Sequence, residues 1–163
     1  MPTKIRSKTP QDFVYTLSDW EEEYCGKQDS RYQSFKIVFN ILMRLNRPIR
    51  VLETGCQRGV EDYGAGCSTL VIADFLSRHK KLQHLTTKEK SIFVSVDNNP
   101  NNMALSQSVI KKFLSQIDYR GVIMDSSQLL QILITEDTGW LPADFPFTFD
   151  FIYLDAVDAD PNS

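Results

Sequence analysis

Apolar residues recur along the chain with two different spacings, and the change comes close to residue 49. Before it, the spacing is that of amphipathic helices; after it, short apolar runs end in acidic residues and alternate with helical stretches. Alternation of this kind is typical of a parallel α/β sheet. The predicted strands cover residues 49–54, 92–97, 121–125 and 149–155, and the predicted helices between them cover residues 68–78, 103–114 and 126–135.

Two helices are predicted ahead of the sheet. The first begins with Thr9 as its N-cap and Pro10 at the first helical position, and Gly26 is a plausible stop. The second begins at residue 29 or 30 and ends before Pro48, which cannot continue a helix. We therefore expect a helical flank over residues 1–47 and the α/β domain over residues 48–163. The polar segments 57–66 and 80–90 are expected to be surface loops.

Composition narrows the class of protein. The 163 residues are 42% hydrophobic and 24% charged, which fits one globular domain with its own core. A net charge of -3 provides no overall basic field, so there is no clear nucleic-acid signal and no sign of a membrane partner. Three cysteines without a C-x-x-C pair argue against a disulfide framework and a thiolate zinc site. With no apolar run of signal or membrane-spanning length, we expect a cytoplasmic protein.

Every predicted strand ends in polar residues. In an open parallel sheet, ligands bind in the crevice beyond the carboxyl ends of the strands, at the point where the strand order reverses. A functional site is therefore expected at this edge. The strand ends are Glu53-Thr54-Gly55-Cys56, Asp97-Asn98-Asn99, Asp125-Ser126-Ser127 and Asp155-Ala156-Val157-Asp158.

The segment after the first predicted strand suits a nucleoside ligand. Gly55 lets the chain turn sharply with no Cβ in the way, and Gly64 and Gly66 let the backbone approach a ligand before a helix starts at Ser68. Glu53 is placed to orient the amides of this loop or, through water, an ammonium group of a ligand.

Residues at the ends of the second and third predicted strands are placed to bind the sugar and the base of such a ligand. From the tip of the second strand, the Asp97 carboxylate can accept hydrogen bonds from both vicinal hydroxyls of a ribose. Asp125 with Ser126 can hold an exocyclic amine of a base. The same Asp-Ser-Ser sequence is also a good helix N-cap that needs no ligand, so both interpretations stay open for Asp125.

Four segments together resemble the motifs of class I, Rossmann-like methyltransferases that use S-adenosylmethionine (SAM). VLETGC at 51–56 with GAGCST at 64–69 resembles the first motif, in a variant whose glycine loop is interrupted by about residues 57–63. VSVD at 94–97 resembles the second motif, MDS at 124–126 the third and FDFIYLD at 149–155 the fourth. The resemblance extends over residues 49–155, and each motif is weak alone while the order of the four is informative.

The resemblance implies a SAM-dependent methyltransferase whose acceptor is of unknown class. It implies a partial Rossmann-like SAM-binding domain over residues 48–163, with the two N-terminal helices beside it. Asp155 would face the reacting centre as the catalytic residue. SAM would be bound by Glu53, Gly55, Cys56, Gly66, Ser68, Asp97, Asn98, Asp125 and Ser126.

The sequence bears on three further interpretations. Asp155, Asp158 and Asp160 resemble the Asp-Ala-Asp region of metal-dependent catechol-type O-methyltransferases, but further ligands are lacking and no metal is expected. An NAD-dependent Rossmann oxidoreductase is disfavoured, because no G-x-G-x-x-G follows the first strand and Asp97 comes 44 positions after Glu53 (97 minus 53) rather than about 20. A non-catalytic SAM-binding or interaction fragment is the third.

The number of predicted strands indicates whether the sheet needs a partner to complete it. The class I methyltransferase sheet normally has seven strands, and this chain provides the first four, which predicts an incomplete fold. The fourth strand would then lie at an exposed, apolar edge over residues 149–154. We therefore expect a truncated chain, or one completed by a partner or by a homodimer through this edge.

Overall fold

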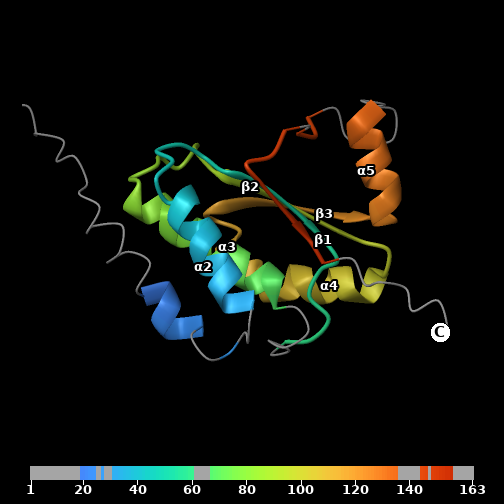
Figure 1. Ribbon diagram of the computed structural model, residues 1–163, viewed down its shortest axis with the longest axis horizontal. Helices are drawn as coiled ribbons and strands as arrows, with labels where there is room; N and C mark the ends of the chain where they lie inside the picture. Colours follow the sequence, from blue (N-terminus) through green and yellow to red (C-terminus); the bar gives the residue numbers. More distant parts are fainter. Residues whose placement is uncertain are drawn as a thin grey trace, which may run out of the picture.

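The computed structural model describes residues 19–24, 27, 31–60, 67–135, 144–146 and 148–155. A parallel four-stranded sheet runs through its centre in the order β3-β2-β1-β4 (Figure 1). Its strands are β1 (Arg50–Thr54), β2 (Ser91–Asp97), β3 (Ile117–Ile123) and β4 (Phe151–Leu154). The predicted parallel α/β architecture is therefore confirmed.

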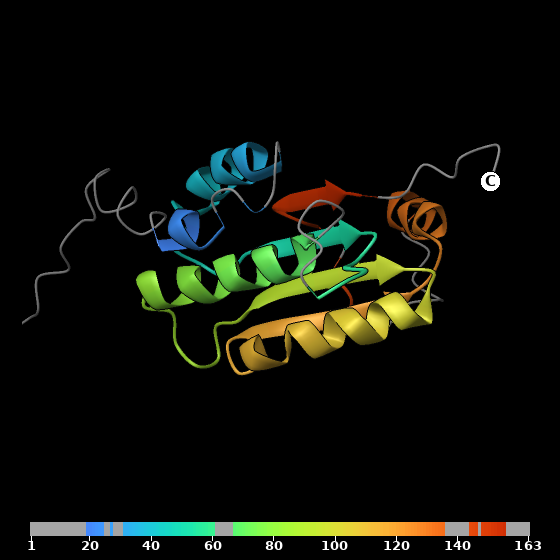
Figure 2. The ribbon, with the colours of Figure 1, turned by 90° about the horizontal axis from the view of Figure 1, so that it is seen from below.

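Helices cover both faces of the sheet. They are α2 (Arg31–Leu42), α3 (Ser68–Leu82), α4 (Pro100–Val109), the short 3-10 helix Lys111–Phe113 and α5 (Ser126–Thr135). In Figures 1 and 2, α2, α3 and α4 lie on one side of the sheet and α5 on the other. The described helices include none that is both long and apolar enough to cross a bilayer.

Several element boundaries differ from the predicted ones; α4 ends at Val109 rather than residue 114, and β4 covers Phe151–Leu154 rather than residues 149–155. α4 begins at Pro100 rather than residue 103, because the Asn99 side chain accepts the Asn101 N–H and so caps the helix. α3 continues to Leu82, into a segment predicted as loop. β3 begins at Ile117, not at residue 121. It is an edge strand, and its first half, IDYR, mixes polar and apolar residues instead of forming an apolar run.

The larger of two apolar cores joins the N-terminal helices to the sheet. The Phe39 ring of α2 stacks on Phe75 of α3 with 4.1 Å between ring centroids, and Trp20 packs edge-on against Phe39 at 5.1 Å. The Tyr24 hydroxyl donates to Asp74 at 2.5 Å. Residues 19–24 are helical, whereas residues 1–18, where this helix was predicted to begin, lie outside the described residues. The described helical flank therefore shares its core with the sheet.

The second core lies under α5. Leu129 and Ile132 of this helix pack against Leu52, Val94 and Val96 of the sheet. Because side chains alternate across a strand, the central strands β1 and β2 contribute to both cores, which explains why they are almost continuously buried.

Among the described helices, α2 covers one face of β4. Tyr153 contacts Phe35 of α2, with 5.0 Å between ring centroids, whereas Ile152 and Leu154 on the opposite face are 45% and 62% exposed. Within the described part of the chain, β4 pairs with β1 and with no second strand. The N-terminal helix thus shields a face of β4 but not its edge, and a homodimer through this edge stays a prediction.

We expect Phe39→Ala to lower the free energy of unfolding by about 3–5 kcal/mol, because it removes a fully buried ring between α2 and α3. Ile37→Ala on the same helix is the matched control; its side chain is 62% exposed, and the change should stay within about 0.5 kcal/mol. Urea denaturation of both variants measures the difference. Equal effects would contradict the docking of α2 on α3.

Candidate functional site

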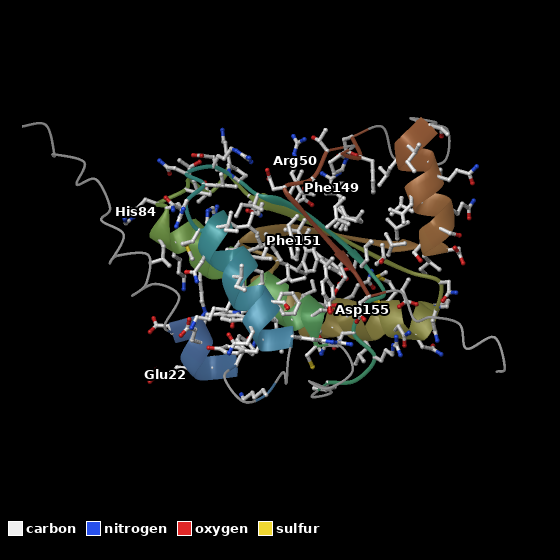
Figure 3. The ribbon with its side chains drawn as sticks, viewed as in Figure 1. Glu22, Arg50, His84, Phe149, Phe151 and Asp155 are labelled. Carbon is white, nitrogen blue, oxygen red and sulfur yellow. The ribbon has the colours of Figure 1, made fainter. Side chains whose placement is uncertain are left out.

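The carboxyl ends of β1, β2 and β4 form one edge of the sheet. The connection from β1 to β2 runs through α3 on one face, and that from β3 to β4 runs through α5 on the other, so the strand order reverses between β1 and β4. The Asp155 N–H donates to the Thr54 carbonyl at 2.9 Å and brings the two strand ends together. In Figure 3, Asp155 lies at the opposite end of this strand pair from Arg50 and Phe149.

Gly55 makes the turn that leaves β1. Its φ of 78° lies in the left-handed region, where a Cβ would be strained, and its N–H donates to the Val96 carbonyl at 2.7 Å. The chain therefore leaves β1 while still bound to β2. The sharp turn predicted at this glycine is confirmed.

Asp97 closes this turn from the neighbouring strand. Its Oδ2 accepts the Cys56 N–H at 3.1 Å, and its Oδ1 accepts the Asn99 N–H at 2.8 Å. The side chain lies at the end of β2 with 9% of the residue exposed. Oδ2 is also 3.5 Å from Cys56 Sγ and from Asn102 Nδ2, so Oδ1 keeps a lone pair for a ligand, whereas a ligand bond to Oδ2 would displace one of these two long contacts. The structure places Asp97 beside the loop that follows Gly55, and the role of Asp97 in binding ribose stays a prediction.

Glu53 lies beneath the loop and is fully buried. Its Oε2 accepts hydrogen bonds from Thr69 Oγ1 at 2.8 Å and Ser95 Oγ at 2.7 Å, and its Oε1 accepts one from the Ser68 hydroxyl. Burial raises the pKa of Glu53 to about 7, against the opposing effect of the three hydroxyls. In this structure Glu53 joins β1, β2 and the first turn of α3, and its predicted roles in orienting the loop amides or a ligand ammonium group stay predictions.

Cys56 contributes its backbone rather than a reactive thiol. Its N–H contacts Asp97, and its Sγ lies 3.5 Å from the same carboxylate. Burial is the main cause that raises the pKa of Cys56 to about 12, so the thiol stays protonated near neutral pH. Cys56 and Cys67 are both free and buried.

Gln57 is a site residue that sequence reasoning missed. The segment 57–66 was predicted as a surface loop, which is wrong for Gln57, because this side chain is fully buried and makes hydrogen bonds to both sides of the turn. Thr69 and Ser95 were missed as partners of Glu53. Ser95 did leave a signal, since it interrupts an apolar strand and lies directly across from Glu53 in the β1–β2 register.

The end of β3 is less enclosed. Asp125 is exposed, and its carboxylate accepts hydrogen bonds from the N–H of Ser127, at 2.9 Å, and from the hydroxyl of the same residue. These bonds, that from the hydroxyl first, lower the pKa of Asp125. The helix-capping interpretation is thus confirmed, and a contact with a base stays a prediction. Asn98 is also exposed, and Ser126 is half-buried.

Asp155 is half-buried beside two arginines. Arg31 Nη1, from the start of α2, lies 3.4 Å from Asp155 Oδ2. Burial raises the pKa of Asp155, and the charges of Arg31 and Arg58 oppose this shift. Gly64, Gly66, Asp158 and Asp160 lie outside the described residues, so their predicted roles stay predictions. Among the residues that are described, no three acidic, histidine or cysteine side chains form a metal-binding group.

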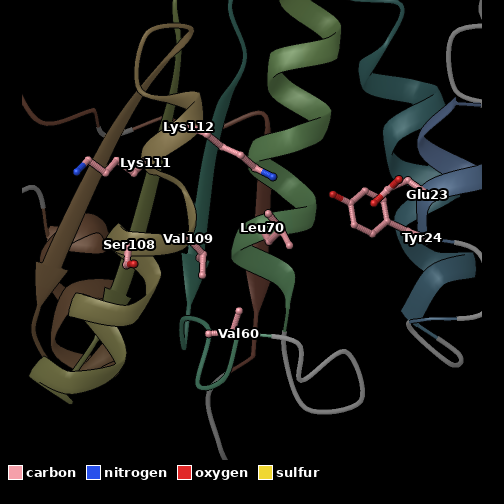
Figure 4. Close-up of a pocket in the computed structure, with 8 residues that line it drawn as sticks. All are labelled: Glu23, Tyr24, Val60, Leu70, Ser108, Val109, Lys111 and Lys112. Carbon is pink, nitrogen blue, oxygen red and sulfur yellow. The ribbon is translucent and has the colours of Figure 1, made fainter.

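A groove of about 620 Å³ borders the loop that follows β1, since Val60 of this loop and Leu70 in the first turn of α3 both line it (Figure 4). Val60, Leu70 and Val109 form part of its apolar lining, and Lys111 and Lys112 contribute charge. None of the predicted site residues lines it. The residues predicted from sequence to form the site lie at the strand ends and not in the lining of this groove.

We expect Glu53→Gln to remove a pH dependence of stability. Because the pKa of Glu53 is raised from 4.5 to about 7 on folding, its proton stabilises the folded state fully below pH 4.5, and this stabilisation is lost as the pH rises through 7. Relative to the variant, the wild type should lose on the order of 3 kcal/mol between about pH 4.5 and 8. Urea denaturation across this range measures the loss.

Asp125→Asn is the control for this experiment. The pKa of Asp125 is lowered, so any contribution it makes to stability disappears in more acidic solution, below its usual value of 3.8. Its pH dependence from about pH 4.5 to 8 should match that of the wild type. A Glu53→Gln profile parallel to the wild type would contradict the assignment of the titration to Glu53.

No protein-family model matches the chain, and no curated protein matches it. Among solved structures, it is similar to the O-methyltransferase from Bacillus cereus in complex with SAH and to the O-methyltransferase TomG from Streptomyces achromogenes, involved in tomaymycin synthesis, in complex with SAM. In both cases the sequence identity is 18%, the TM-score is 0.42, and the match covers 94% of this chain and 57% of the other. The chain thus spans little more than half the length of these structures. Similarity at this level concerns the fold, and the chemistry has to come from the residues of this chain.

Proposed function

We propose that the chain binds SAM at the carboxyl ends of β1 and β2 and functions as a SAM-dependent methyltransferase. The observation that supports this most directly is the position of Asp97, a carboxylate at the tip of β2 that is hydrogen-bonded to the loop following Gly55. A ribose placed over that loop would present two hydroxyls to the Asp97 oxygens, while the glycine leaves room for the backbone to approach the ligand.

The sign of charge at this edge also fits. Asp97 and Asp155 lie at the ends of β2 and β4, on either side of the end of β1, and Glu53 is buried below them. Opposite charges attract most strongly where water is partly excluded. SAM carries a sulfonium and an ammonium group, both of which are cationic. The Asp97 carboxylate would therefore favour this cofactor, whereas the charge of Asp155 is offset by Arg31 and Arg58.

Methyl transfer demands positioning more than new chemistry from the protein. SAM supplies an activated methyl group, and the chain has to hold an acceptor nucleophile in line with it. Asp155 lies across from the cofactor loop and has a raised pKa, which suits a carboxylate that receives a proton from an acceptor hydroxyl. We propose that the acceptor binds beside Asp155, where Arg31 of α2 forms the neighbouring wall.

Isothermal titration with SAM, with its demethylated product (SAH) and with NAD tests the proposal. The wild type should bind SAM and SAH and not NAD, and Asp97→Asn should weaken SAH binding at least about tenfold, because it exchanges a charged acceptor of two hydrogen bonds for a neutral amide. NAD binding without SAM or SAH binding would favour an oxidoreductase instead.

Asp118→Asn is the matched control for the cofactor titration. Asp118 also lies in a strand and accepts hydrogen bonds from a neighbour, Arg120, but it is near the amino end of β3, away from the loop. Its variant should keep wild-type affinity for SAH. An equal loss in both variants would show that Asp97 acts through general stability and would count against the ribose contact.

A further inference from the structure

Gln57 is buried in the turn that follows β1, although the next residues along the chain are exposed. Its exposed fraction is 0%, whereas Val60 is 61% exposed and Arg58 is also exposed. Burying an amide side chain costs free energy unless its two N–H donors and its carbonyl acceptor are all hydrogen-bonded. The partners of Gln57 therefore explain why it is there.

The side chain of Gln57 closes the turn on itself and ties it to α3. Nε2 donates to the Gly59 carbonyl at 2.8 Å and to the Val60 carbonyl at 3.3 Å. Oε1 accepts the Leu70 N–H, one of the free donors in the first turn of α3, at 3.2 Å. With two carbonyls on one side and an N–H on the other, only one orientation of the amide satisfies all three bonds.

The backbone of Gln57 connects the same turn to the polar cluster below it. Its N–H donates to Thr69 Oγ1 at 3.0 Å, and that hydroxyl donates in turn to Glu53. Its carbonyl accepts a hydrogen bond from Ser106 of α4 at 3.4 Å. The preceding residue, Cys56, is the one whose N–H contacts Asp97. Any shift of Gln57 is therefore transmitted to the loop beside Asp97.

We propose that Gln57 is a positioning residue that holds the loop of residues 55–60 in the shape in which it receives the cofactor. This inference rests on the proposed function, since it concerns the same site. A loop held in its binding shape before the ligand arrives loses less conformational entropy on binding than a free one. Without the amide, the carbonyls of Gly59 and Val60 would turn to water and the loop would widen.

A pair of isosteric variants tests this role. Gln57→Met keeps the length and volume of the side chain and removes its three hydrogen bonds. It should weaken SAH binding at least about tenfold, measured by isothermal titration, because the loop must then be ordered on binding. Gln83→Met is the matched control. Gln83 also donates its amide to a backbone carbonyl, that of Met43 at 2.5 Å, but it does so at the far end of α3.

Gln83→Met should keep wild-type affinity for SAH even where it lowers the melting temperature. Wild-type affinity in Gln57→Met would overturn the inference and leave the proposed function standing. Equal losses in Gln57→Met and Gln83→Met would also overturn it, because the effect would then be one of general stability. A wild-type protein that binds neither SAM nor SAH would overturn the proposed function and this inference with it.

Gln57→Glu adds a readout that stability alone would not move. Below the pKa of the new carboxyl group, its O–H regains one donor toward the Gly59 carbonyl; above it, the charge repels both carbonyls. Burial at this position should raise the pKa of the new carboxyl group above its usual value of about 4.3, and the wild type corrects for Glu53, whose pKa is raised to about 7 in the same cluster. SAH affinity relative to the wild type should therefore be higher near pH 5.5 than near pH 8.5, by about tenfold. An affinity ratio that does not change with pH would contradict the positioning role of Gln57. This variant also tests that role if Gln57→Met does not fold.

Discussion

The buried carboxyl group of Glu53 sets a constraint that much of the surrounding structure satisfies. A carboxyl group with no access to water needs hydrogen-bond donors, and three hydroxyls from two different elements meet that need. Ser95 links it to β2, and Ser68 and Thr69 link it to the start of α3. The side chain of Glu53 thus couples the pairing of β1 with β2 to the position of α3 and to the path of the loop between β1 and α3.

The carboxyl groups at this edge of the sheet differ in how far they are buried. Glu53 is fully buried, and burial raises its pKa to about 7, whereas Asp97 and Asp155 lie at the carboxyl ends of β2 and β4. Under the proposed function, the buried carboxyl group would hold the loop and the two outer carboxylates would contact the ligands. Gln57 extends the inner set into the loop itself, because its backbone rests on Thr69 and its amide binds the loop's own carbonyls.

The N-terminal helices pack against α3 and β4, the elements that border the strand ends. Phe39 stacks on Phe75 of α3, and Arg31 at the start of α2 reaches Asp155 at the end of β4. The described helical flank is therefore both part of the larger core and one wall of the strand-end crevice. A segment of this kind can influence which molecules approach Asp155 without contributing a strand to the sheet.

Local patterns in the sequence determined the number, type and order of the described strands and of the helices between them, the sharp turn at Gly55 and the presence of an acidic residue at each strand end. Those features depend on period, on turn chemistry and on short apolar runs, which are visible in neighbouring residues. The start of β3 was not visible, because an edge strand has no continuous apolar run. Only the tertiary structure decided that Gln57 is buried, that Ser68, Thr69 and Ser95 converge on Glu53, and that Arg31 pairs with Asp155 across 124 positions. Such contacts join residues far apart in the chain, and their burial depends on which helix packs over which strand, so no local pattern encodes them.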